Sequence, residues 1–402
     1  MITLRDIADA RDRVGLVLRR TPVDRSDSLT RMVGRPVILK PEHLQRTGSF
    51  KIRGAYNFIS RLDGDGEVVA ASAGNHAQGV ALAARLTGRG ATIFMPANAP
   101  LPKVEATRSY GATIRLEGAV VDECMDGARR YAEETGAVFV PPFDDPLVIA
   151  GQGTVGLEIS EEIGGDPADL DVVAVPVGGG GLIAGVATAL AHTRHGTKVI
   201  GVEAEGADAV RRSVEAGHVV SVHRPDTMAD GIAVRAPSEL TLAHIRAYVD
   251  DVVTVTEEEI SRAILLLLER AKAVVEPAGA VALAAVLAGK VPGKGPALAV
   301  ISGGNVDPLL LIKLIDHGLS AAGRYLLLRI VLDDRPGALA GLTEAVATMG
   351  LNVIEVEHHR AGLKLGVDEV EVLLTLETRD PDHRHQVVTD LEMRGFNVEL
   401  VR

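Results

Sequence analysis

The sequence predicts an α/β protein in two parts, a large parallel-sheet region followed by a small antiparallel unit. Apolar strand runs alternate with helical runs up to about residue 320, which is the pattern of crossover units in a parallel sheet. After residue 325 the predicted order becomes β-α-β-β-α-β, which defines a ferredoxin-like unit. Three glycine-containing turns follow apolar strands, where an open α/β sheet builds its ligand site.

Composition excludes several classes of protein. The 402 residues are 47% hydrophobic and 24% charged, which indicates a globular protein with a substantial core. A net charge of −12 argues against nucleic acid as a partner, because phosphate binding needs a basic surface. Cys124 is the only cysteine, which excludes an intramolecular disulfide and indicates a reducing compartment.

No membrane or export signal is expected. Residues 1–20 lack the apolar core of a signal peptide. The longest uncharged run, 172–193, could span a bilayer by length, but it contains Pro176 and four consecutive glycines. We therefore predict a cytoplasmic protein with no membrane partner.

Residues 1–320 are expected to form the larger part, with a small domain at about 54–141 inserted in a large one. Strands are predicted at 37–40, 68–71, 91–95, 113–116, 138–140, 172–177, 198–203 and 297–302. Helices are predicted at 4–19, 52–62, 77–86, 103–110, 120–135, 151–163, 182–192, 257–272 and 279–288.

Residues 325–402 are expected to form the second part, after a linker of small residues at 319–324. Its predicted strands are 325–332, 352–359, 369–377 and 397–401, and its predicted helices are 337–349 and 383–394.

The stretch from Gly48 to Gly54 carries a candidate reactive lysine. Ser49 can cap the helix that follows, which places Lys51 in the first turn, where the macrodipole disfavours an ammonium. Arg53 adds a positive charge nearby. Both effects would lower the pKa of Lys51 and favour the free amine that a Schiff base needs. A lone lysine is usually a surface residue, so this interpretation depends on the rest of the chain.

The tetraglycine Gly178–Gly181 is a candidate anion site. It follows a strand and opens a helix, so backbone N–H groups can converge on a phosphate. No Lys-Ser/Thr follows, which excludes a P-loop. Gly179, Gly181 and Ala184 match G-x-G-x-x-A, with Glu203 ending the next strand. The pattern therefore fits two kinds of ligand, a nicotinamide dinucleotide or another phosphate-bearing cofactor.

Two further loops repeat this geometry. Residues Ser72–His76 follow a strand, and their N–H groups could hold a carboxylate while the Asn75 amide meets a hydroxyl or phenolate. Beside a helix cap, His76 is expected to be a packed or solvated histidine and not a base. Ser302–Asn305 follow another apolar strand, so the three loops are expected to build one site.

These motifs together resemble threonine dehydratase (threonine ammonia-lyase), a fold-type-II pyridoxal-phosphate family related to serine dehydratase and serine racemase. The resemblance rests on 49–54, 72–79, 178–181 and 302–305 and covers about residues 1–320. The tail resembles an ACT domain through 334–339 and 350–353. The chain is thus similar to the form of threonine dehydratase that has one C-terminal ACT domain.

The resemblance implies a role for each motif. Lys51 would carry pyridoxal 5′-phosphate as a Schiff base and act as general base, with Phe50 against the ring. The other cofactor contacts would be Asn75 at the ring 3-oxygen, Ser302 at the pyridine nitrogen, Glu276 nearby, and Gly178, Gly179, Gly180 and Gly181 at the phosphate. Ser72, Ala73, Gly74 and Asn75 would take the substrate carboxylate.

Two departures from the family matter. Racemases of the family carry a second serine where this chain has Ala73, which favours a dehydratase. Some relatives bind a cation through an acidic loop that here retains Glu203 but has Ala209 at a second carboxylate position. Two interpretations of this loop remain open: it binds a cation through Glu203 and the Ala207 carbonyl, or it is a solvated acidic loop.

The expected activity is deamination of L-threonine to 2-oxobutanoate and ammonia, with L-serine as a second substrate. That activity would fit amino-acid metabolism such as isoleucine biosynthesis. The tail would pair subunits into a dimer or tetramer and bind isoleucine or valine. The alternatives are a nicotinamide dehydrogenase, a non-catalytic amino-acid sensor, and another lyase, racemase relative, synthase or sulfhydrylase with a non-regulatory tail.

Overall fold

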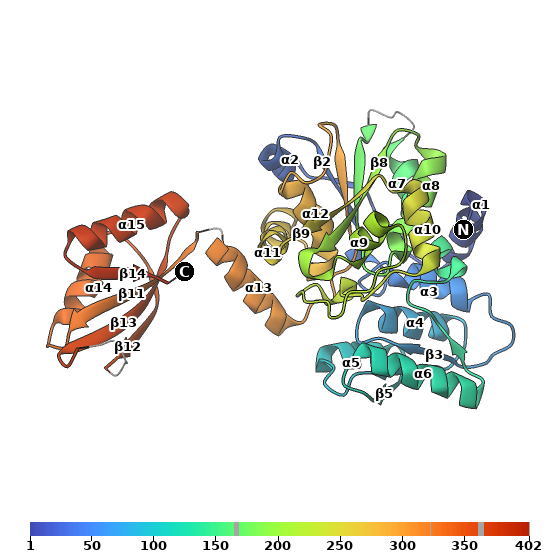
Figure 1. The fold of residues 1–402 in the computed structure, drawn as a ribbon, viewed down its shortest axis with the longest axis horizontal. Helices are drawn as coiled ribbons and strands as arrows, with labels where there is room; N and C mark the ends of the chain where they lie inside the picture. Colours follow the sequence, from blue (N-terminus) through green and yellow to red (C-terminus); the bar gives the residue numbers. More distant parts are fainter. Residues whose placement is uncertain (165–168, 322, 361–365, 402) are drawn as a thin grey trace. The chain divides into compact units, whose positions relative to one another are not determined.

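The computed structural model describes residues 1–164, 169–321, 323–360 and 366–401. The chain divides into two compact units, Met1–Leu311 and Ile312–Arg402. Among the described residues, the first unit contains a six-stranded and a four-stranded sheet, and the second unit contains a four-stranded sheet (Figure 1). The mixed α/β class and the ferredoxin-like unit expected from the sequence are confirmed.

The six-stranded sheet has the order β1-β2-β10-β7-β8-β9 and is parallel except for β1. Its strands are β1 (Asp24–Arg25), β2 (Val37–Pro41), β7 (Val172–Pro176), β8 (Lys198–Ala204), β9 (Asp251–Val255) and β10 (Ala297–Ile301). The central strands β2, β7 and β10 are buried along their whole length, as expected for a parallel sheet covered on both faces.

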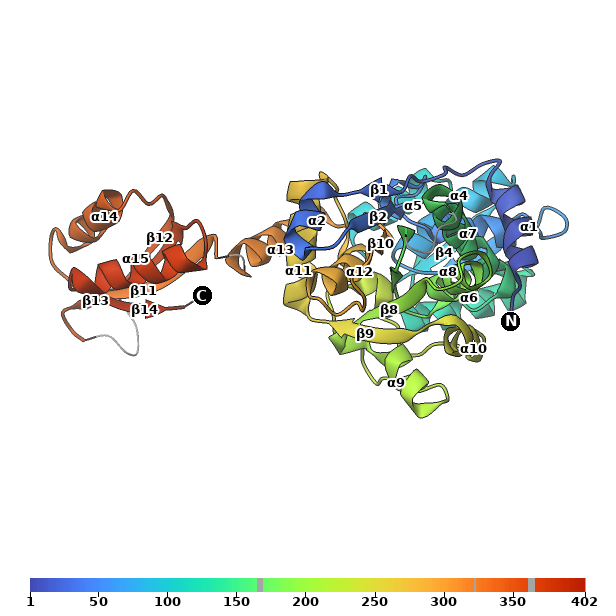
Figure 2. The same cartoon turned by 90° about the horizontal axis from the view of Figure 1, so that it is seen from above.

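Helices cover both faces of this sheet (Figure 2). On one face lie α2 (Asp27–Val33), α11 (Glu257–Leu266) and α12 (Pro277–Leu287). On the other lie α1 (Leu4–Val14), α7 (Pro146–Ile163), α8 (Gly181–Thr193) and α10 (Glu239–Tyr248). The short helix α9 (Ala209–Ala216) follows β8. Apolar side chains of the central strands form one core with those of α7, α8 and α10, and α1 contributes to a separate cluster with α7 and α8.

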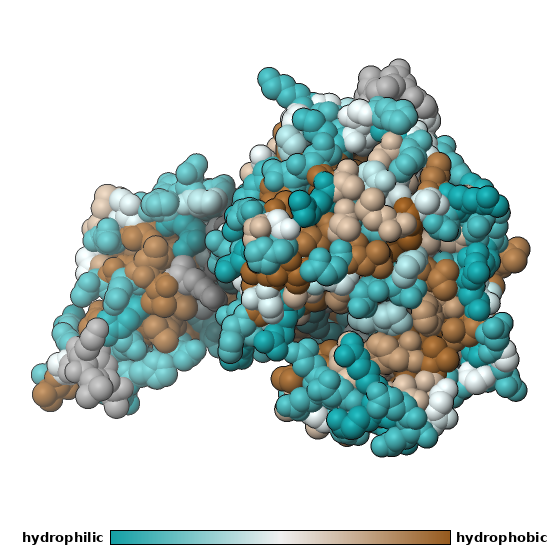
Figure 3. Space-filling model, turned by 45° about the vertical axis from the view of Figure 1, so that its right-hand side comes forward, coloured by the Kyte–Doolittle hydropathy of each residue, from teal (hydrophilic) through white to brown (hydrophobic). Residues whose placement is uncertain are grey.

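The four-stranded sheet of the first unit is parallel, with the order β5-β4-β3-β6. Its strands are β3 (Val68–Ala71), β4 (Ala91–Met95), β5 (Thr113–Leu116) and β6 (Val138–Phe139). The helices packed around it are α3 (Lys51–Ile59), α4 (Asn75–Leu86), α5 (Leu101–Ser109) and α6 (Val121–Thr135). The outward face of α6 is charged, and the lowest part of the first unit in Figure 3 is accordingly mostly teal.

Lys51 lies at the border between the two sheets of the first unit. Phe50 packs against the core of the six-stranded sheet, whereas Ile52 is buried in the core of the four-stranded sheet. The two chain neighbours of Lys51 therefore belong to different cores.

The second unit has the antiparallel order β12-β13-β11-β14. Its elements are β11 (Tyr325–Asp333), α14 (Ala338–Thr348), β12 (Val353–His359), β13 (Glu369–Glu377), α15 (Pro381–Met393) and β14 (Asn397–Leu400). The buried side chains of β11 and β13 form a core with α14 and α15.

Several predicted boundaries are wrong. The first helix ends at Val14 instead of 19, and the α-helix from Glu257 ends at Leu266, where a π-helical stretch (Leu267–Ala271) takes over. Helix α13 (Pro308–Ala321) extends into the segment predicted as a linker. The sequence patterns also missed β1, α2, α9, α10, β9 and the whole of α13. Within the described part of the chain, no helix is long and apolar enough to cross a membrane.

Candidate active site

A cavity of about 940 Å³ opens between the two sheets of the first unit. Its lining includes every residue that the sequence assigned to cofactor or substrate carboxylate: Phe50, Lys51, Ser72, Ala73, Gly74, Asn75, Gly178, Gly179, Gly180, Gly181, Glu276 and Ser302. The loops come from the C-terminal ends of β3, β7 and β10. Three segments far apart in sequence thus meet at one site, as the motifs predicted.

Lys51 is the first residue of α3, and its amine lies inside this cavity. Its Nζ donates a hydrogen bond to the carbonyl oxygen of Pro142 at 2.9 Å and lies 5.4 Å from the centre of the Phe50 ring. Burial lowers the pKa of Lys51 to about 8, although the nearby carboxylates of Glu276 and Asp144 oppose the shift. Roughly a tenth of this lysine is therefore the free amine at pH 7, far more than for a lysine with its ordinary pKa.

The expected reasons for the low pKa of Lys51 need correction. Phe50, and not Ser49, is the N-cap of α3, and no described side chain caps this helix. Ser49 is buried and its hydroxyl has no hydrogen-bond partner among the described residues. Arg53 is neutralised by two carboxylates, so burial is the dominant cause.

Arg53 is the centre of a buried ion cluster beneath the Lys51 helix. Its guanidinium donates to Glu42 at 2.7 and 2.8 Å and to Glu158 at 2.7 and 2.9 Å. Lys40 donates to Glu158 at 2.7 Å. Burial alone would raise the pKa of Glu42, but Arg53 and Lys40 hold it below its usual value. These pairs tie α3 to β2 and α7.

Asn75 and Glu276 face each other across the cavity wall. The Asn75 amide nitrogen donates to Glu276 Oε1 at 2.5 Å. Burial, reinforced by the charge of Asp230, raises the pKa of Glu276 to about 7. Glu276 can therefore exchange a proton near neutral pH beside Lys51.

The tetraglycine forms the turn between β7 and α8. Gly180 has φ +90° and is the N-cap of α8, which no described side chain caps. A Cβ on Gly179 would lie 2.4 Å from the Phe143 ring, so only glycine allows this close approach. The uncapped N–H groups at the start of α8 provide a site for an anion.

His76 is buried, and its Nε2 donates to the Val140 carbonyl oxygen at 3.0 Å. Burial lowers its pKa to about 3, and the positive charge of Lys51 adds to the shift. Of the two states expected for His76, packed or solvated, the structure shows the packed one.

Glu203 and Ala207 do not line the cavity. The two carboxylate oxygens of Glu203 accept from the backbone N–H groups of Val210 and Arg211 at 2.9 and 2.8 Å, at the start of α9. Burial raises the pKa of Glu203 to about 8. Glu203 is thus a buried helix cap, whereas Glu205 in the same loop is exposed, and Glu203 is not placed to hold a dinucleotide ribose in the cavity. The described residues contain no group of three or more His, Cys, Asp or Glu that could hold a metal ion.

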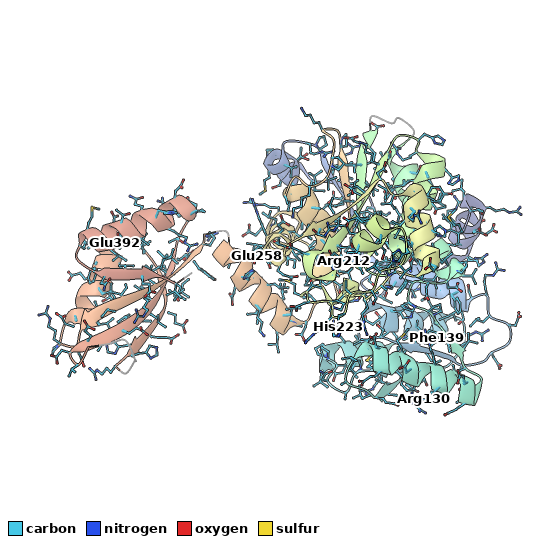
Figure 4. All side chains as sticks on the ribbon, in the orientation of Figure 1. Arg130, Phe139, Arg212, His223, Glu258 and Glu392 are labelled. Carbon is cyan, nitrogen blue, oxygen red and sulfur yellow. The ribbon has the colours of Figure 1, made fainter. Side chains whose placement is uncertain are left out.

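The sequence missed several residues of the cavity. Pro142 and Phe143, which follow β6, line the cavity. Lys103 of α5 also lines it and forms an ion pair with Asp230, which lies in the segment before α10. His223, from the same segment, also lines the cavity and lies between the two sheets in Figure 4. The segment before α10 has little regular structure, so no periodicity marked it.

The comparisons with known proteins agree with this site. Residues 14–303 match the family profile of pyridoxal-phosphate dependent enzymes, and residues 326–392 match that of ACT domains. An L-threonine ammonia-lyase from Thermotoga maritima is 48% identical over all of both chains. A solved threonine deaminase isoform 2 from Solanum lycopersicum is 39% identical, with a TM-score of 0.74, over 78% of this chain and 86% of that one. A maize serine racemase is 38% identical, with a TM-score of 0.73, over 79% of this chain and 98% of that one.

The fold and the cavity thus define a pyridoxal-phosphate dependent enzyme that carries a C-terminal ACT domain. Within that class, the chain belongs to the threonine ammonia-lyase family. The nicotinamide interpretation of the glycine pattern is therefore wrong.

Proposed function

We propose that this chain deaminates L-threonine to 2-oxobutanoate and ammonia, with L-serine as a second substrate. The observation that carries the proposal is the buried amine of Lys51, with a pKa of about 8, in a cavity lined by all three glycine-containing loops. The full-length similarity to an L-threonine ammonia-lyase supports the same substrate.

The residues of the cavity fit pyridoxal phosphate. Lys51 offers a free amine, and the uncapped start of α8 offers backbone N–H groups for a phosphate. The Ser302 hydroxyl lines the cavity, where it can meet a ring nitrogen without protonating it. Asn75 offers its amide to a phenolate oxygen.

The cofactor, when bound, supplies an electron sink for the pair of electrons left at the substrate Cα. The chain supplies the rest. The free Lys51 amine takes the Cα proton as general base, and the Ser72–Asn75 loop holds the substrate carboxylate. A neutral Ser302 keeps delocalisation into the ring modest, which favours prompt loss of the β-hydroxyl.

A serine racemase relative is the second candidate, because of the similarity to the maize structure. Racemisation needs an acid on the face opposite Lys51. Ala73 lines the cavity where the family's racemases have a serine, and a methyl group carries no proton to donate. We therefore expect elimination to dominate.

One assay separates these possibilities. Purified protein with pyridoxal phosphate is incubated with L-threonine or L-serine, and keto acid, ammonia and D-serine are each measured. The proposal requires keto acid and ammonia in equal amounts. D-serine as the main product would establish the racemase, and no product from either substrate would refute the proposal.

The proposal extends to regulation by the ACT domain, at residues Asp334–Leu339. Gly337 has φ +93° and is the N-cap of α14, and no described side chain caps that helix. Its N–H groups would suit the carboxylate of isoleucine or valine. Gly337→Val should abolish any response of threonine kinetics to either amino acid, whereas Gly341→Val, on the exposed side of α14, should preserve it. An unchanged response in Gly337→Val would leave the tail only a structural role, such as pairing subunits of a dimer or tetramer.

A cation at Glu203 and Ala207 stays a prediction, and so does a role in isoleucine biosynthesis. The first is tested by measuring activity and thermal stability after chelation and after readdition of magnesium or potassium.

A further inference from the structure

A chain of side-chain hydrogen bonds joins the loops after β3 and β10 to the segments that precede α3 and α12. The Asn305 amide nitrogen donates to the carbonyl oxygen of Thr47 and to Asn75 Oδ1, both at 2.7 Å. Asn75 in turn donates to Glu276 Oε1 at 2.5 Å. The order is therefore Thr47 carbonyl, Asn305, Asn75, Glu276.

The direction of this chain is fixed at its first link. A backbone carbonyl oxygen can only accept, so the Asn305 nitrogen must face Thr47. Its second hydrogen then faces Asn75, which has to present its oxygen to Asn305. The nitrogen of Asn75 consequently points the other way, towards Glu276. Amide orientation is set by such networks of partners.

The surrounding backbone holds Asn305 in place. The Gly304 N–H donates to the Gly48 carbonyl at 2.9 Å, and Phe50 N–H donates to the Ser302 carbonyl at 3.1 Å. A Cβ on Gly48 would lie 2.4 Å from Asn305 Oδ1. The Asn305 side chain therefore has little room to turn.

The other end of the chain is equally crowded. A Cβ on Gly303 would lie 2.0 Å from Glu276 Oε1 and 3.0 Å from the Asn75 nitrogen. Asn75 and Glu276 both line the cavity. One hydrogen of the Asn75 amide is used by Glu276, and no described residue accepts the other, which is available to a ligand.

We propose that Asn305 is a positioning residue that fixes the Asn75 amide with its N–H₂ group towards Glu276 and the bound cofactor. The inference rests on the proposed function for the identity of that cofactor. The free hydrogen of the Asn75 amide would bind an acceptor oxygen of the cofactor, such as the phenolate oxygen of pyridoxal phosphate. Asn305 itself does not line the cavity, so it acts only through Asn75.

The test is a double-mutant cycle on cofactor binding. Asn305→Asp is nearly isosteric but can only accept, so Asn75 must reverse to donate to it and would turn an oxygen towards the cofactor. We expect the Kd of pyridoxal phosphate to rise about tenfold, the size expected when one hydrogen bond to a charged group is lost, with a shift of its visible absorption band. In an Asn75→Ala background the same substitution should change the Kd less than about twofold, because the link is already broken.

Asn397→Asp is the matched control. It adds the same charge at an exposed position of β14 and should leave Kd and spectrum unchanged. Thermal unfolding of each variant reports any loss of stability separately, and Asn305→Ala should give a smaller rise in Kd than Asn305→Asp, because alanine does not force the reversal.

Two results would overturn the inference: an unchanged Kd and spectrum in Asn305→Asp, or an equal rise in Kd with and without Asn75. Failure of the proposed function has a different signature, a wild-type protein that binds pyridoxal phosphate yet forms no keto acid.

Discussion

The Nζ of Lys51 donates to the carbonyl oxygen of Pro142 at 2.9 Å, and both residues line the cavity between the two sheets of the first unit. Lys51 begins α3, and Pro142 follows β6 of the four-stranded sheet. This bond directs the amine into the cavity, while burial removes the water that would stabilise its charge. The position of the amine therefore follows from the hydrogen bond, and its reactivity follows from burial.

The first prediction concerns the pH dependence of cofactor attachment. The neutral amine is the nucleophile, and its fraction rises with pH through the pKa of Lys51, which is about 8. The rate at which cofactor-free protein gains the visible band of attached pyridoxal phosphate should therefore rise with pH and level off above about 8. A rate that keeps rising beyond pH 10 would indicate an ordinary exposed lysine.

Replacing Ser302 should affect the elimination reaction without preventing cofactor binding. Ser302→Asp places a carboxylate at the buried position where the serine hydroxyl lines the cavity. The charge would favour a protonated ring nitrogen, so we expect retained cofactor binding, slower formation of keto acid and more side reactions such as transamination. Our account of this serine fails if the variant forms 2-oxobutanoate as fast as the wild type.

Glu276 should control how kcat/KM falls at low pH, the acid limb of its pH profile. Burial and Asp230 raise its pKa to about 7, against the opposing charges of Lys103 and Lys51. As the pH falls below about 7, Glu276 gains a proton and holds Asn75 less strongly, so kcat/KM should fall. Glu276→Gln should lose this limb. An identical limb in the variant would assign it to another group.

Arg53 should matter chiefly for stability. Arg53→Met leaves Glu42 and Glu158 buried with Lys40 as the only remaining cation of the cluster. The expected loss is about 3–5 kcal/mol in the free energy of unfolding, the usual cost of breaking a buried ion pair. Denaturant unfolding measures it.

The control for Arg53 is Arg130→Met on α6 (Figure 4), which breaks an exposed pair with Glu117. That pair should contribute less than about 1 kcal/mol. Equal losses in the two variants would show that the buried cluster has no special importance.

The elements that the sequence predicted well are those with one dominant signal. Val68–Ala71 is a continuous apolar run between two polar residues, and Ala91–Met95 is apolar except for Thr92 and lies between a glycine and a proline. The observed bounds of both strands equal the predicted ones. Helix α10 was missed although Ser238 and Thr241 form a capping box at its start. Its apolar spacing is irregular, and only that cap could have indicated it.

The sequence predicted those site residues whose side chains belong to a recognisable motif. Lys51, Asn75 and Ser302 belong to such motifs and do meet in one cavity. The Pro142 carbonyl could not be predicted, because a backbone oxygen leaves no residue-type signal. The cause of the low Lys51 pKa was also missed, since burial and the pairing of Arg53 depend on tertiary packing.

The most direct measurement of the central claim compares formation of 2-oxobutanoate from L-threonine by the wild type and by Lys51→Ala, both saturated with pyridoxal phosphate. Lys51 is the one residue assigned both cofactor attachment and removal of the Cα proton. The account predicts keto acid from the wild type only, together with loss of the visible band of attached cofactor in the variant. Activity of Lys51→Ala within about tenfold of the wild type, a difference of only ~1.4 kcal/mol in the barrier, would contradict it.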